Sequence, residues 1–180
     1  MSLLFQLTDK DIGMPFREVK NYKIRIAARG IIINEEAKIA IQKKTNTKEY
    51  KLIGGGIENG ESPSDGFKRE VFEETGCKIN IIHEIGIVEE YISMKSIKQI
   101  SYIFVAKVLN DTSKLNLTEK EKAEGAELIW VSPIDALRLM ENSYHELTSS
   151  TYEVDYDVYR MKFISLRDRK ILKYYIDNYE

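Results

Sequence analysis

Apolar and polar residues alternate over several short stretches of the chain, which is the period of a β-strand. Residues 23–33 (KIRIAARGIII) begin with this alternation and end in a β-branched run. A turn at residues 34–36 should lead into a returning strand at residues 37–42. Residues 45–47 mark a second turn before a short strand at residues 50–53. The first third of the chain therefore predicts strands joined by tight turns.

Two longer strands are predicted further along, at residues 79–91 and 99–108, with a loop around residues 94–96 between them. A short apolar strand is expected at residues 128–131. Ser132 and Pro133 then begin a helix that should run to about residue 141. The mixture of many strands with separate helices predicts an α+β fold with a mixed sheet.

A helix is also predicted over residues 63–75, between the two groups of strands. Ser62 suits the N-cap, Pro63 the first helical position, and Asp65 the first turn. Gly76 suits the residue that ends the helix, because glycine adopts the left-handed conformation of a C-cap easily.

This helix carries three carboxylates, Glu70, Glu73 and Glu74, at positions i, i+3 and i+4. At about 100° per residue they fall on one face, where like charges repel. They are either a solvated surface face or a site for a hard cation such as Mg²⁺ or Mn²⁺. The preceding stretch favours the metal site, because residues 52–57 (LIGGGI) form a glycine loop that lets backbone approach a ligand and Glu61 stands at the helix entrance.

The segment from Gly55 to Cys77, GGIENGESPSDGFKREVFEETGC, has the spacing G-x5-E-x7-R-E-U-x-E-E-x-G-U, where U is a bulky apolar residue. This pattern resembles the Nudix box, with Cys77 standing where the family usually has Ile, Leu or Val. The resemblance covers about residues 20–142. It implies an α/β/α sandwich around a mixed sheet and metal-dependent cleavage of diphosphate bonds.

The resemblance also implies a role for each residue of the box. Glu70, Glu73 and Glu74 would ligate the metal together with the backbone carbonyl of Gly54, and Glu61 would hold an additional or outer position. Arg69 would orient and neutralise the glutamates. The metal would lower the pKa of a bound water, which attacks one phosphorus, so that no covalent nucleophile is needed.

The general base that activates this water is sought on the acidic loop of residues 117–127. Glu124 is the preferred candidate by its position before the single tryptophan, and Glu121 is the second. Glu70, inside the box, is the third possibility. The same loop can also be an ordinary charged surface segment.

Composition agrees with one enzyme domain. The chain has 180 residues, of which 43% are apolar and 31% charged, with a formal net charge of −2. This charge argues against broad nucleic-acid binding but permits a small nucleotide-type substrate. A single cysteine, no apolar run near the roughly 20 residues of a membrane span and no evident signal peptide predict a cytoplasmic protein without membrane contact.

Three parts are expected along the chain: an N-terminal segment (1–20), a Nudix hydrolase domain (21–142), and a C-terminal tyrosine-rich segment and helix (143–180). Helical spacing over residues 163–179 predicts an amphipathic helix that packs on the domain or on the partner in a homodimer. Alternatively, the tyrosine-rich stretch at residues 145–159 covers the substrate cleft.

Substrate contacts are the least marked in the sequence. Arg29, in the first long strand, and Tyr91, at the end of a later one, are the candidates for substrate binding. Because the markers of known Nudix subgroups are absent, a MutT-like pyrophosphohydrolase of a nucleoside diphosphate linked to another moiety, including nucleoside triphosphates, is the default. The alternative is a nucleotide- or ADP-ribose-sensing module that keeps the fold with little turnover.

Overall fold

The structure is a computed structural model of the chain, and it describes residues 1–15, 17–111, 118–147 and 154–180. Residues 148–153 of the predicted tyrosine-rich stretch lie outside this described part. The elements follow in the order β1 (Leu3–Leu7), η1 (Asp9–Ile12), β2 (Lys23–Ile33), β3 (Ile39–Lys44), β4 (Glu49–Gly56), α1 (Pro63–Thr75), β5 (Cys77–Ile92), η2 (Ser93–Lys95), β6 (Ile97–Asp111), α2 (Glu119–Ala123), β7 (Ala126–Val131), α3 (Pro133–Ser143) and α4 (Val154–Tyr179).

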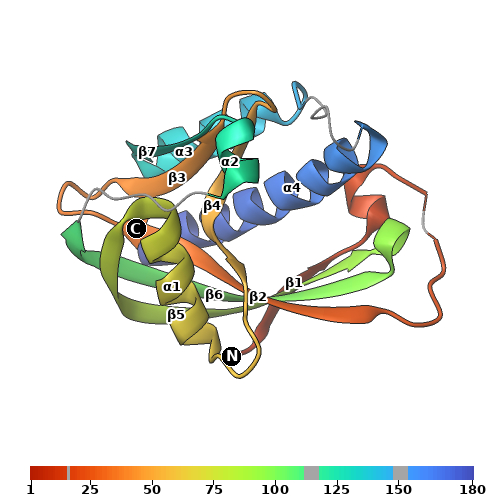
Figure 1. The fold of residues 1–180 in the computed structure, drawn as a ribbon, viewed down its shortest axis with the longest axis horizontal. Helices are drawn as coiled ribbons and strands as arrows, with labels where there is room; N and C mark the ends of the chain where they lie inside the picture. Colours follow the sequence, from red (N-terminus) through yellow and green to blue (C-terminus); the bar gives the residue numbers. More distant parts are fainter. Residues whose placement is uncertain (16, 112–117, 148–153) are drawn as a thin grey trace.

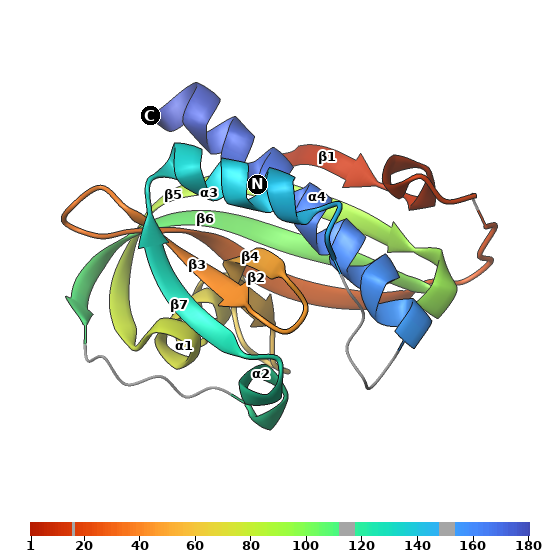
Figure 2. The same cartoon turned by 90° about the horizontal axis from the view of Figure 1, so that it is seen from above.

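Seven strands form one mixed sheet in the order β1-β5-β6-β2-β4-β3-β7. β2 runs parallel to β6 along its whole length, and β1 runs parallel to β5. The remaining neighbours are antiparallel. Figures 1 and 2 show the long α4 lying across the middle of this sheet, with β3, β7 and α3 on one side of it.

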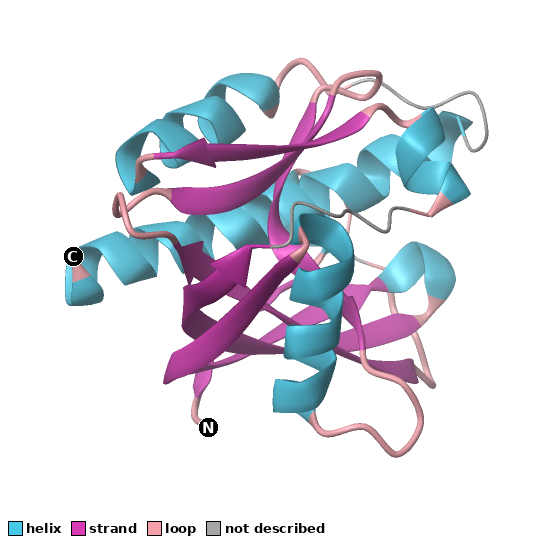
Figure 3. Cartoon of the chain, turned by 60° about the vertical axis from the view of Figure 1, so that its left-hand side comes forward, coloured by secondary structure: helices cyan, strands magenta, loops and turns pink. Residues whose placement is uncertain are grey.

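Helices cover both faces of the sheet, because consecutive side chains of a strand point to opposite faces. On β2, Ile32 packs with Phe67 and Val71 of α1 in one hydrophobic cluster. Its neighbour Ile31 packs in another cluster with residues of α3 and α4, including Met140. Figure 3 shows the helices on either side of the strands. The predicted α/β/α arrangement with a mixed sheet is confirmed.

The sheet divides at β4. Residues Ile53–Gly56 of this strand pair with β2, whereas Glu49–Leu52 pair with β3. At the point of division the buried backbone N–H of Leu52 donates to Oδ2 of Asp168 at 2.9 Å. Asp168 belongs to α4, so this helix provides the acceptor where the strands separate and closes the opening between them.

The described elements extend several of the predicted ones. The strand at residues 23–33 (β2) and the helix at residues 63–75 (α1) have the expected bounds. The two long strands β5 and β6 each extend a few residues beyond the predicted ends. α4 begins at Val154, earlier than its apolar spacing predicted. The N-terminal segment contributes β1 to the sheet, and its Leu7 and Ile12 are buried against Phe163 of α4.

The short helix α2 was not predicted, because the acidic loop around it has little apolar spacing. It begins with a capping box: the Glu121 N–H donates to Thr118 Oγ1 at 3.2 Å, and Thr118 N–H donates to Glu121 Oε2 at 2.9 Å. The Thr-x-x-Glu spacing at residues 118–121 is the signal in the sequence from which this helix could have been predicted.

Candidate active site

α1 holds the acidic residues, and local signals determine its two ends. The hydroxyl of Ser62 accepts the Asp65 N–H at 3.2 Å. Gly76 ends the helix with φ 72° and donates its N–H to the Phe72 carbonyl. Between these ends, Phe67 and Val71 are fully buried under the sheet. Glu74 lies on the same side of the helix and is buried with them, whereas Glu70 and Glu73 are partly exposed.

Arg69 gathers three of the glutamates around its guanidinium group. Its Nε and Nη2 each donate to Glu61 at 3.0 Å, and its Nη1 donates to Glu70 at 2.8 Å and to Glu73 at 3.2 Å. Nη2 also donates to the carbonyl of Gly56. The hydrogen bonds from Arg69, followed by that of the Glu58 N–H, hold the pKa of Glu61 below its usual value. Arg69 therefore holds Glu61, Glu70 and Glu73 around one positive charge.

Glu74 lies apart from this group, beneath the glycine loop. It is buried, and its carboxylate accepts the Gly54 N–H at 3.0 Å and Lys51 Nζ at 3.1 Å. Burial raises the pKa of Glu74, against the opposing effects of Lys51 and the Gly54 N–H. Gly54 thus touches the cluster through its N–H, whereas the sequence pointed to its carbonyl as a metal ligand.

Gly54 and Gly55 pack so closely against neighbouring atoms that neither position has room for a side chain. A Cβ on Gly55 would lie 2.2 Å from Glu70 Oε2. Gly54 adopts φ 136°, and a Cβ there would lie 2.3 Å from the Ala28 carbonyl oxygen. Side chains at either position would therefore displace the acidic residues or the neighbouring strand.

The carboxylates are an incomplete metal cage in this arrangement. Within the described ranges, no three His, Cys, Asp or Glu side chains converge in a geometry that holds a metal ion. The donor chemistry nevertheless suits a hard cation, because the oxygens of Glu61, Glu70 and Glu73 already surround one positive charge, that of Arg69.

A cavity of about 400 Å³ opens beside the glycine loop, between β4, the long strands and α4. One side carries the carboxylates of Glu70, Glu74 and Glu121. These residues are called the acidic side below, together with Arg69 and its partners Glu61 and Glu73 beside Glu70. The lining also includes four guanidinium groups, from Arg25 and Arg29 of β2 and from Arg160 and Arg167 of α4, and this part of the wall is called the arginine side. This volume falls within the range of small-ligand sites.

The arginine side is joined by a buried polar network. Arg25 donates to Gln99, which in turn donates to Glu90. Arg167 donates to Glu90 at 3.1 Å and to Asp168 at 2.7 Å. Because Asp168 also accepts the Leu52 N–H, the network links the cavity wall to the division in the sheet.

Of the two residues proposed for substrate binding, Arg29 lines the cavity and Tyr91 lies on the other face of the sheet. Arg29 is buried and donates to the hydroxyl of Ser101 at 3.3 Å. Burial, followed by repulsion from Arg167, lowers the pKa of Arg29 to about 10. Tyr91 follows Glu90 on β5, so its side chain points away from the cavity, where its hydroxyl donates to Glu89 at 2.9 Å.

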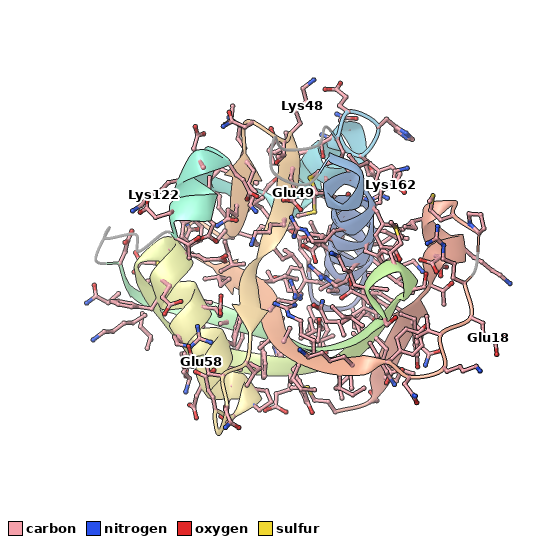
Figure 4. The ribbon with its side chains drawn as sticks, turned by 45° about the vertical axis from the view of Figure 1, so that its right-hand side comes forward. Glu18, Lys48, Glu49, Glu58, Lys122 and Lys162 are labelled. Atoms are coloured by element: carbon pink, nitrogen blue, oxygen red, sulfur yellow. The ribbon has the colours of Figure 1, made fainter. Side chains whose placement is uncertain are left out.

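The two candidates for the general base on the acidic loop lie in different places: only Glu121 lines the cavity. Glu124 is buried and accepts from Lys44 Nζ at 2.5 Å, outside the cavity lining. Glu121 lines the cavity and accepts from Gln42 at 3.5 Å. Burial raises the pKa of Glu121, but the N–H and hydroxyl of Thr118, Lys51 and Gln42 outweigh it, and the net shift is downward. In Figure 4, Lys122, the residue after Glu121, points outward from α2.

The arginine side was largely missed in the sequence. Arg25, Glu90 and Gln99 lie within strands whose alternation was recognised, but nothing in their spacing indicates that they meet. Arg160 precedes the predicted start of the last helix. Once α4 is extended to Val154, however, positions 160, 163, 164 and 167 form one helical stripe, and all four line the cavity.

The chain was also compared with known proteins. The NUDIX domain family matches residues 23–150. A MutT-like protein of Streptomyces ambofaciens is 22% identical over 66% of this chain and 71% of its own length. A putative 8-oxo-dGTP diphosphatase of Bacillus subtilis is 27% identical over 57% of this chain and 63% of its own length.

Solved structures agree in fold. A NUDIX hydrolase from Nitrosomonas europaea superposes with a TM-score of 0.52 at 20% identity, over 69% of this chain and 90% of its own. A NUDIX-family hydrolase from Clostridium perfringens has a TM-score of 0.51 at 16% identity, and the match covers 83% of this chain and 96% of the other. This chain belongs to the NUDIX domain family. It is a hydrolase that acts on diphosphate bonds.

Proposed function

We propose that the protein is a Mg²⁺- or Mn²⁺-dependent pyrophosphohydrolase of a nucleoside diphosphate linked to another moiety, including nucleoside triphosphates. One observation supports this proposal: Glu70 and Glu74 of the Nudix box line the same cavity as four guanidinium groups. Carboxylates suit the metal, and guanidinium groups suit phosphate oxygens.

The box residues would hold the metal. Glu70, Glu73 and Glu74 supply the carboxylate oxygens, with Gly54 beside them and Glu61 in an additional or outer position. When bound, the metal supplies a water of lowered pKa and polarises the phosphoryl oxygens. Arg69 would remain the group that orients Glu61, Glu70 and Glu73, as its present hydrogen bonds support.

The cavity lining favours Glu121 as the general base over Glu124. Its Oε2 already accepts two hydrogen bonds from Thr118, whereas Oε1 accepts only the long bond from Gln42 among the contacts found in the described chain. Oε1 is therefore the atom that would take the proton from the attacking water. Glu124 is occupied by the buried Lys44.

Arg29 and Arg25 would bind the phosphate oxygens of the substrate. Both lie on β2, directly across from the glycine loop: Arg29 pairs with Gly54 in the ladder, and Arg25 Nη2 approaches Gly56. A diphosphate placed between them and Glu70 would contact cationic groups on one side and the metal on the other. Lys51, ion-paired with Glu74, completes the neutralisation.

The test is release of phosphate in the presence of a coupling phosphatase, measured for the full chain in Mg²⁺ and in EDTA. The panel contains dNTPs, 8-oxo-dGTP, ADP-ribose, diadenosine polyphosphates and nucleotide sugars. We expect cleavage of one class that EDTA abolishes. Absence of turnover across the panel, with nucleotide binding seen by calorimetry, would replace the enzyme with the sensing module.

A further inference from the structure

Arg167, in the cavity wall, carries a buried hydrogen-bond donor that no described residue uses. Its side chain is only 1% exposed, and its Nε and Nη1 are occupied by Asp168 and Glu90. Its Nη2 is buried without any hydrogen-bond partner among the described residues. Such a donor is costly to leave unpaired, and the residue that carries it lines the cavity.

The arginine side also carries more positive than negative charge. Arg25, Arg29, Arg160 and Arg167 contribute four positive charges to the cavity wall. Glu90, in the same wall, and Asp168, bonded to Arg167, contribute two negative ones, so the balance is 4 − 2 = +2. Burial is the main cause that lowers the pKa of both Arg25 and Arg29, and repulsion from Arg167 adds to it. A bound anion would relieve this repulsion.

The contribution of α4 comes from one face of the helix. Arg160, Phe163, Ile164 and Arg167 stand at i, i+3, i+4 and i+7 and line the cavity. Lys162 lies on the opposite face and points away from β4 in Figure 4. All of α4 follows residue 150, where the family match ends, so Arg160 and Arg167 lie outside the matched domain.

We propose that Arg160 and Arg167 bind a second anionic group of the substrate, a phosphate monoester or a carboxylate on the moiety that lies on the arginine side. The proposal rests on the proposed function, since it places the scissile diphosphate near the acidic side and Arg25. Arg160 and Arg167 then determine specificity. Substrates that carry this extra anion bind better than otherwise identical ones that lack it.

Binding in EDTA tests this without turnover. Isothermal titration calorimetry compares NADPH with NADH, which differ by one phosphate monoester, and UDP-glucuronate with UDP-glucose, which differ by one carboxylate. We expect the more anionic member of at least one pair to bind about tenfold more tightly, as a charge-assisted hydrogen bond allows. The pair that discriminates identifies the anion as phosphate or carboxylate.

Three variants connect this preference to α4. Arg160→Gln should reduce the preference to about twofold or less, because one of the cations is lost. Arg167→Lys keeps the charge but removes the free Nη2, and should reduce the preference as well, with thermal unfolding measured to verify the fold. Lys162→Gln, two residues from Arg160 on the opposite face, loses the same charge and should keep the full preference.

The outcomes separate this proposal from the proposed function. Equal binding within both pairs in the unaltered protein overturns it, as does a preference that Arg160→Gln and Lys162→Gln change equally. Neither result contradicts metal-dependent turnover, which is measured separately. Conversely, an anion preference that depends on Arg160, in a protein that cleaves nothing in the panel, supports the second anion site and overturns the hydrolytic function.

Discussion

The acidic side and the arginine side of the cavity are built in opposite ways. The partners of Arg69 lie within 13 residues of it along the chain, from Gly56 to Glu73. On the arginine side, Arg167 meets Glu90 across 77 residues, and Asp168 meets Leu52 across 116. The group around Arg69 is a local pattern of α1 and the loop before it, whereas the arginine side exists only once distant segments have packed together.

The difference extends to what each side contributes. Glu73 is 39% exposed as a side chain, so its charge costs the fold little. Arg167 and Asp168 are buried in the centre of the molecule, where an unpaired charge is expensive. We therefore expect the acidic side to govern catalysis with little effect on stability, and the arginine side to govern both stability and selection of the substrate.

The largest expected effect is on the acidic side. Glu73→Gln should reduce turnover roughly a thousandfold, because a lost metal ligand removes several kcal/mol of transition-state stabilisation. Stability should change by less than about 0.5 kcal/mol, the value of an exposed helical ion pair. Turnover and thermal unfolding of the variant measure both. Full activity in Mg²⁺ would remove Glu73 from the mechanism.

The next effect is on the arginine side. Asp168→Ala leaves Arg167 with one partner fewer and the Leu52 N–H with no acceptor from α4, which should cost about 3–5 kcal/mol. For a chain of this size the melting temperature should fall by on the order of 10 °C.

The matched control is Asp177→Ala, on the exposed face of the same helix, where the carboxylate pairs with Lys173. This variant should stay within about 0.5 kcal/mol of the unaltered protein. Equal melting temperatures for the two variants, measured by calorimetry, would show that Asp168 does not hold α4 to the sheet.

The smallest effect probes the packing between the glycine loop and α1. Gly55→Ala places a Cβ against the Glu70 carboxylate and should lower turnover roughly tenfold by displacing that group. Gly56→Ala, one residue further, has 3.4 Å to its nearest neighbour and should lower turnover less. If both alanine variants retained full turnover, the position of Glu70 would not limit the reaction.

The parts of the protein whose interactions are local could be predicted from the sequence. The helix 63–75, its cap at Ser62 and the association of Arg69 with the glutamates all follow from residues a few positions apart. The placement of Glu124 and Tyr91 could not be read in this way. Whether Glu124 faces the cavity or Lys44 depends on the pairing of β3 with β7, and the face of Tyr91 depends on the register of β5.

The hydrogen bond from Leu52 to Asp168 has a consequence for how the protein matures. α4 follows every strand in the chain, so a nascent polypeptide on the ribosome contains the whole sheet before it contains this helix. During that interval the strands that part at β4 leave an amide at their junction open to water, and the cavity has no arginine wall from α4. The box helix can form early, but the pocket is completed only by a segment that is synthesised after every strand.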